Sequence, residues 1–108
     1  MGPAESKNLR AIGARLALYV RNRDGAVNRA ALQAAAADLT AGLPEIGPPL
    51  GDLVGRPGFR ALLPLAGQGK GEVEREALIQ DVARIYLPEV AAALREILNG
   101  FLEAPMRS

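Results

Sequence analysis

The sequence predicts an all-α protein, a small bundle of about four helical segments that ends in a long helix. Apolar residues recur at steps of three and four over long stretches at both ends of the chain, which is the period of an amphipathic helix. No stretch keeps the period-two alternation of a half-buried strand long enough to form one. With 108 residues the chain fits one domain, residues 1–108.

Two helices are predicted in the first part of the chain. The first covers residues 6–23, and its apolar stripe consists of Leu9, Ile12, Gly13, Leu16 and Val20. Asp24-Gly25 has the chemistry of a tight turn. Asn28 is a good N-cap for a second helix over residues 28–41. We expect the alanine-rich face of this second helix to lie close to the backbone of a neighbour.

The middle of the chain, residues 43–71, has a different character. It holds five of the eight prolines and most of the glycines, so no long regular element is expected. Residues 50–54 fit one short helical turn, and residues 58–65 fit another. Because these turns are rich in leucine, we expect an ordered connector that packs across the helices.

The last helix is predicted over residues 72–102. Its apolar residues, from Ile79 to Phe101, recur at steps of three and four and keep their phase across Pro88. Two separate helices would have no reason to stay in phase. The pattern therefore favours one long helix that is kinked at Pro88.

These apolar stripes together predict the hydrophobic core. Its expected members are Leu9, Ile12, Leu16, Val20, Leu32, Leu39, Phe59, Leu62, Ile79, Val82, Tyr86, Val90, Leu94 and Ile97. The ends of the chain, residues 1–5 and 103–108, fall outside the stripes and are expected to be flexible.

The composition excludes several classes of function. The chain has no cysteine and no histidine, which removes disulfides, thiolate metal sites and Ser-His-Asp catalysis. The acids of residues 72–96 fall mostly on the polar side of the last helix, where a solvated face is the usual role. We therefore expect a protein that is not an enzyme and uses neither cofactor nor metal. No signal-peptide pattern or apolar run of about 20 residues is present, so cytoplasmic residence is expected.

The sequence GQGKG, residues 67–71, raises the question of phosphate binding. A phosphate loop needs a preceding strand and a serine or threonine after its lysine. Here Pro64 interrupts the preceding segment, and Gly71 stands in the place of the hydroxyl residue. Glu72 and Glu74 also occupy the helix end that would attract an anion. The sequence favours a flexible connector over a ligand loop.

A second candidate is VRNRDGAVNRAA, residues 20–31, which can be aligned with a calcium-binding EF-hand loop. Asn22 and Asp24 fall at ligand positions three and five of the twelve. Val20 and Ala31 occupy positions one and twelve, where the first ligand and the bidentate acid belong. The stretch is therefore interpreted as a tight corner between two helices, and no metal is expected.

The charges are unevenly distributed along the chain. Residues 1–29 carry six basic side chains against two acidic ones, and residues 72–103 carry seven acidic against three basic. Either the first and last helices pack side by side, or the basic surface binds an acidic partner such as nucleic acid. The contacts in the second case would be Arg10, Arg15, Arg21, Arg23 and Arg29. The absence of interleaved aromatic residues favours the first reading.

The function favoured by the sequence is a non-catalytic protein-interaction or regulatory module, whose partner is either another protein or a second copy of the chain in a homodimer. Apolar positions on residues 78–102 cover more than the single stripe of a surface helix. Part of this apolar surface is expected to remain exposed near the end of the helix, and exposed apolar patches often mark interfaces. The predicted interface residues are Leu87, Leu98, Phe101 and Leu102. The alternative is a monomer in which the connector covers this patch.

Overall fold

The computed structural model describes residues 6–24 and 26–103. Six helices follow one another: α1 (Ser6–Arg21), α2 (Arg29–Leu39), α3 (Gly47–Gly55), the 3₁₀ helix η1 (Pro57–Leu65), α4 (Glu72–Ala83) and α5 (Pro88–Leu102). No strand occurs in the two described ranges, so the all-α prediction is confirmed, with six helices in place of about four. The expectation of flexible ends covers residues 1–5 and 103–108, and all of these except Glu103 lie outside the described residues.

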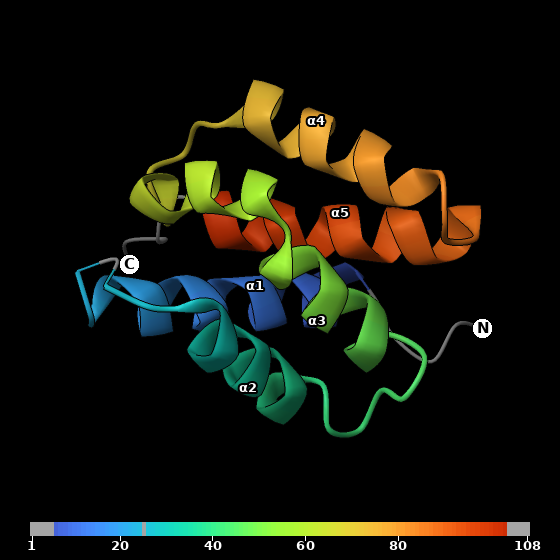
Figure 1. Ribbon diagram of the computed structural model, residues 1–108, viewed down its shortest axis with the longest axis horizontal. Helices are drawn as coiled ribbons and strands as arrows, with labels where there is room; N and C mark the ends of the chain where they lie inside the picture. The colour runs from blue at the N-terminus through green and yellow to red at the C-terminus, as the bar shows by residue number, and fades with distance from the viewer. Residues whose placement is uncertain (1–5, 25, 104–108) are drawn as a thin grey trace.

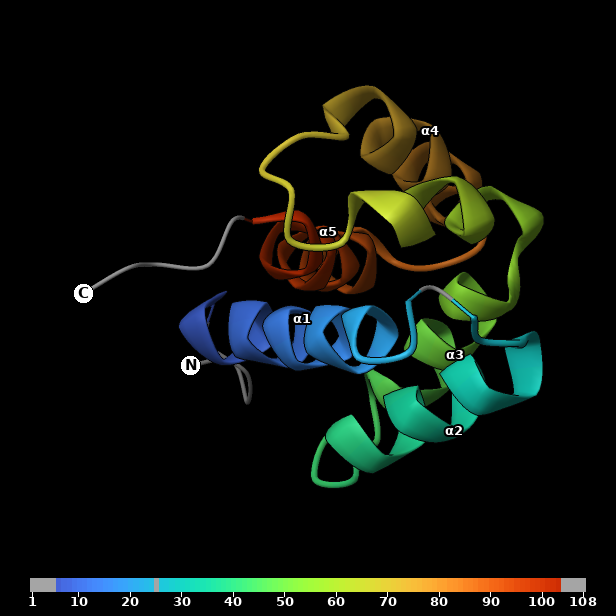
Figure 2. The ribbon, with the colours of Figure 1, turned by 90° about the vertical axis from the view of Figure 1, so that its left-hand side faces the viewer.

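The helices are arranged around the pair α1 and α5, which lie side by side (Figure 1). In Figure 1 both run from right to left, but Figure 2 shows that they cross at an angle; at the crossing Gly13 meets Ile97 and Phe101, and Gly100 meets Arg10. On one side of this pair, α2 and α3 form an antiparallel hairpin; on the other, α4 runs antiparallel to α5 with η1 beside it (Figure 2).

Two glycines allow α1 and α5 to touch backbone to backbone. A Cβ atom on Gly13 would lie 1.8 Å from the carbonyl oxygen of Ile97, and one on Gly100 would lie 2.0 Å from that of Arg10. No side chain fits in either gap, so glycine is required at both positions. The basic N-terminal helix and the acidic C-terminal helix are thus neighbours, as the first of the two interpretations of the charge distribution predicted.

The α2–α3 hairpin is fixed by its ends and by its small residues. Asn28 caps α2 as predicted, since its Oδ1 accepts a hydrogen bond of 2.7 Å from the Ala31 amide. Gln33 Nε2 donates to the carbonyl of Gly51 on α3 at 3.1 Å. The small residues at this contact are glycines of α3: a Cβ on Gly55 would meet Gln33 and Arg29, and one on Gly47 would meet Thr40. Of the alanines of α2 only Ala36 is buried, so the close approach does not depend on an alanine-rich face as expected.

The connector is packed, which confirms that part of the prediction. Its two turns are α3 and η1, both with proline in the first turn, where the missing N–H costs nothing. Their buried apolar side chains are Leu50, Leu53, Val54, Phe59, Leu62 and Leu63. The Phe59 ring lies 5.2 Å from the Phe101 ring of α5, so the connector forms a central part of the core.

The prediction of one long helix kinked at Pro88 is wrong. The chain leaves the helix after Ala83 and starts α5 at Pro88, and α4 and α5 form an antiparallel pair. Pro88 lacks the N–H that a continuous helix needs, and it holds Leu87 in an extended conformation with ψ of 153°. The apolar phase survives because Tyr86, in the turn, still packs against the core.

The glycine segment before α4 closes the end of α5. The Gly67 amide donates to the carbonyl of Phe101 at 2.9 Å, and the Gly69 amide donates to that of Leu102 at 2.6 Å. These carbonyls belong to the last turn of α5, which has no partner within its own helix. Gly67, Gly69 and Gly71 all have positive φ, which explains the choice of glycine. Amides that could have cradled a phosphate are used here as a helix cap.

The core prediction is confirmed for most of its members. Leu39, Tyr86 and Val90 are only partly buried, at the edge of the cluster. The described helices include none that is both long and apolar enough to cross a membrane.

Candidate interaction surface

The corner between α4 and α5 carries two neighbouring exposed aliphatic side chains. Ile85 is 63% exposed and Leu87 is 65% exposed. The described residues contain only two other large hydrophobic side chains with high exposure, Leu18 and Val73, and these stand on separate helices. Single exposed apolar residues are normal on a protein surface, but an adjacent pair on one corner is a candidate contact point.

The backbone of this corner is held in place from both sides. Tyr86, between the two aliphatic residues, packs against the core and donates a hydrogen bond of 3.0 Å from its hydroxyl to Asp52 Oδ2 on α3. Pro88 fixes φ at the first position of α5. The residues on either side of this tyrosine, Ile85 and Leu87, are the two mostly exposed ones. The pair is therefore presented on a rigid turn.

A polar cluster lies beneath the corner and connects it to α3 and α4. Arg56 donates to Asp52 Oδ2 at 3.0 Å, and its guanidinium also lies 3.7 Å from Asp81 Oδ2. Burial and the hydrogen bond to Asp52 raise the pKa of Tyr86 above its ordinary value. The Nε of Arg56 is buried without a hydrogen-bond partner. The cluster is well suited to positioning the corner.

The structure places most of the predicted interface in the core. Leu98 and Phe101 have no exposed surface, and Leu102 is 4% exposed. They are covered because α5 packs mainly against α1, with α4 folded back beside it and Phe59 of η1 next to Phe101, whereas the prediction assumed a single extended helix. Of the four predicted residues only Leu87 lies on the surface. Ile85, which the prediction left out, accompanies it.

The five arginines proposed as nucleic-acid contacts do not form one patch. With about 100° per residue, Arg10 and Arg21 face nearly the same side of α1, while Arg15 points about 140° away from Arg10. Arg10 is paired with Glu96 at 2.9 Å. Arg23 lies 3.9 Å above the Tyr19 ring in a cation–π contact, and Arg29 is at the start of α2.

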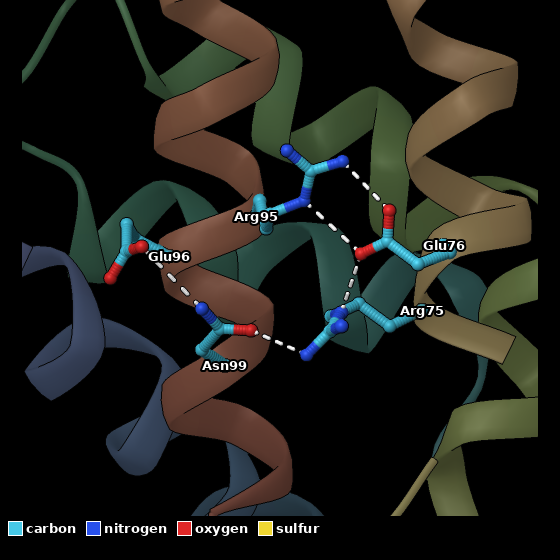
Figure 3. A network of polar contacts seen from close by, with 5 residues as sticks. All are labelled: Arg75, Glu76, Arg95, Glu96 and Asn99. Carbon is cyan, nitrogen blue, oxygen red and sulfur yellow. Dashed lines mark hydrogen bonds and ion pairs between the residues drawn. The ribbon is translucent and has the colours of Figure 1, made fainter. Parts of the chain in front are cut away.

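A polar network joins α4 to α5 (Figure 3). Glu76 accepts hydrogen bonds from Arg95 on both carboxylate oxygens, at 2.7 and 3.1 Å, and from Arg75 at 2.9 Å. Arg75 also donates to Asn99 Oδ1 at 2.8 Å. The bonds from Arg95 and Arg75 hold the pKa of Glu76 below its ordinary value, although desolvation opposes them.

This network predicts a pH dependence of stability. A carboxylate whose pKa is lower in the folded state stabilises the protein above its unfolded pKa, and the contribution is lost as pH falls through the folded pKa. The difference in unfolding free energy between wild type and Glu76→Gln should therefore shrink on going from pH 7 to pH 3. We expect a change of about 0.5–1 kcal/mol, because the pair is partly exposed. Urea titrations at both pH values measure it, and an unchanged difference would contradict the assigned role of Glu76.

The described residues contain no group of three or more acids that could hold a metal ion. One hollow of about 330 Å³ lies near the glycine segment and is lined by Arg10, Lys70, Arg75, Glu72 and Glu103, among others. Its lining includes three basic and two acidic side chains, so the charges nearly balance and favour neither an anion nor a cation.

Comparison with known proteins adds no functional evidence. The chain matches no protein-family model, no curated protein and no solved structure. The function is therefore inferred from the surface of the protein. The most distinctive feature of this surface is the exposed pair Ile85 and Leu87 at the α4–α5 corner.

Proposed function

We propose that the protein is a non-catalytic interaction module that binds another protein through the α4–α5 corner. The observation that carries the proposal is the exposed pair Ile85 and Leu87, on a turn fixed by Tyr86 and Pro88. Apolar anchors on a rigid backbone lose little conformational entropy on binding, which favours their use in interfaces. The partner can be a different protein or a second copy of this chain.

Two further observations support a binding role over catalysis. The chain has neither histidine nor cysteine, and no described acids are clustered for metal binding. Its partly buried carboxylates at positions 52 and 76 accept hydrogen bonds from arginine or tyrosine and thus have structural partners. The nucleic-acid alternative ranks lower, since the basic side chains on α1 face different sides and Arg10 has an acidic partner.

Site-specific photocrosslinking tests this proposal. A photoreactive amino acid at position 87 should give a discrete crosslinked species when the full chain is irradiated in a lysate of cells that produce it. The same amino acid at position 73 is the matched control, because Val73 is 80% exposed but stands alone on α4. Mass spectrometry of the product distinguishes a foreign partner from a second copy.

The two positions should give different results. Crosslinking must depend on position 87 and must be lost when Ile85 is changed to Glu in the same chain. Equal labelling from positions 87 and 73, or none from either, would remove the corner as an interface. Sedimentation equilibrium at several concentrations then decides independently whether the chain self-associates.

A further inference from the structure

Helix α4 is attached to the rest of the protein by a small apolar face. Only three of its twelve residues are buried, Leu78, Ile79 and Val82. By comparison, α5 buries seven of its fifteen residues. Figure 2 shows α4 on the outside of the bundle, resting on η1 and α5. Elements with few buried apolar side chains open at lower free energy than the core does.

One end of α4 is suited to a hinge movement, because the segment before it contains Gly67, Gly69 and Gly71, all at positive φ. The turn at the other end is held by Tyr86 and Pro88, so α4 would swing about this fixed corner. The glycine segment is anchored to α5 through the amides of Gly67 and Gly69, whereas Lys70 and Gly71 make no such bond. The chain can therefore change direction at residues 70–71 without breaking the cap of α5.

The remaining contacts of α4 are mostly polar pairs at its two edges. Glu76 meets Arg95 of α5 on one edge, and Asp81 meets Arg56, between α3 and η1, on the other. Such partly exposed pairs contribute little net stability, because water replaces the partner when they separate. They do define a pattern of charge, with a basic residue on each side of the apolar strip that α4 covers.

We propose that α4 opens from the folded protein as a unit, and that the uncovered surface of η1 and α5 binds an amphipathic helix from a partner protein. The pattern of α4 itself defines that helix. It has apolar residues at the positions of Leu78, Ile79 and Val82, flanked by acids at the positions of Glu76 and Asp81. Binding of an apolar helix face in a groove is a common mode of recognition. The binding of a partner helix rests on the proposed interaction function, whereas the opening of α4 does not.

Thiol labelling tests the opening by itself. The chain has no cysteine, so single variants are labelled at one position only. Val82→Cys reports on α4, and Val20→Cys, equally buried on α1, is the matched control. We expect the thiol at position 82 to react at least about tenfold faster and with a weaker urea dependence than that at position 20. Equal rates with equal urea dependence would show that α4 opens only with global unfolding, and would overturn the proposal.

A fluorescent peptide copying residues 72–86 tests the binding surface. It should bind the intact protein weakly, because the protein's own α4 competes for the surface. In a Glu76→Gln protein the apparent Kd should fall about twofold to fivefold, since a weaker latch raises the open fraction. A peptide with Leu78→Gln and Val82→Gln is the control. If the two peptides give the same anisotropy, or if Glu76→Gln leaves the Kd unchanged, the uncovered surface is not a helix-binding groove. Either result leaves the corner at Leu87 to be judged by its own crosslinking experiment.

Discussion

Replacing Gly13 with alanine should destabilise the protein by about 2–3 kcal/mol, because the added methyl group forces α1 and α5 apart. The new Cβ would lie 1.8 Å from the Ile97 carbonyl oxygen and 2.7 Å from the Phe101 amide nitrogen. Both are backbone atoms, which cannot move aside as the end of a flexible side chain can. The midpoint of urea unfolding measures the loss, and Gly100→Ala should produce a similar one.

Gly51→Ala is the matched control, and its expected effect on stability has the opposite sign. Gly51 lies inside helix α3, and a Cβ added there meets nothing within 4 Å. Alanine loses less backbone freedom on folding than glycine, so Gly51→Ala should be neutral or stabilising by up to about 1 kcal/mol. If both substitutions had the same small effect, the close approach of α1 and α5 would have to be rejected.

Changing Phe101 to glutamate should abolish cooperative folding. The ring is fully buried and lies 5.2 Å from the Phe59 ring, so the substitution combines a lost aromatic contact with a buried, unpaired carboxylate. A cost above about 4 kcal/mol is expected, which is a large part of the stability of a small domain. Circular dichroism during thermal unfolding should show a broad transition or none.

Leu87→Glu is the control for this change. Its side chain is already in solvent, so stability should stay within about 0.5 kcal/mol of wild type. A Phe101→Glu protein that unfolds as cooperatively as the Leu87→Glu protein would place the Phe101 ring on the surface after all. The interface expected from the sequence included both Phe101 and Leu87. The predicted pair of results would assign Phe101 to the core and Leu87 to the surface.

The period of three and four was enough to predict α1, α2 and most of the core, because each helix has a single apolar stripe. It failed at Pro88 because phase alone does not distinguish a kinked helix from a turn that keeps its central residue packed. The predicted interface failed for the same reason. Leu98 and Phe101 looked surplus when residues 72–102 were counted as one helix, but they are buried because α5 packs against α1, with α4 and η1 on its other side.

The corner itself was only partly visible in the sequence. Leu87 precedes a proline, and the residue before a proline is disfavoured in the helical conformation. This signal could have marked the end of a helix before Pro88, and with it a turn at Ile85 to Leu87. The hydrogen bond from Tyr86 to Asp52 joins positions 34 residues apart. No local pattern encodes such a pairing. The same is true of the bond between Arg95 and Glu76, which depends on the turn that the sequence failed to predict.

The backbone contact between α1 and α5 has a consequence for the synthesis of the chain. Gly13 needs Ile97 and Phe101 as neighbours, and these are made more than eighty residues later. A ribosome therefore releases α1 long before its main packing partner exists. The α2–α3 hairpin, whose contacts are local, can form while the chain is still growing, but α1 must wait with its apolar stripe unshielded. Closing such a long loop is slow for a helical protein, so folding should be completed only after α5 has emerged.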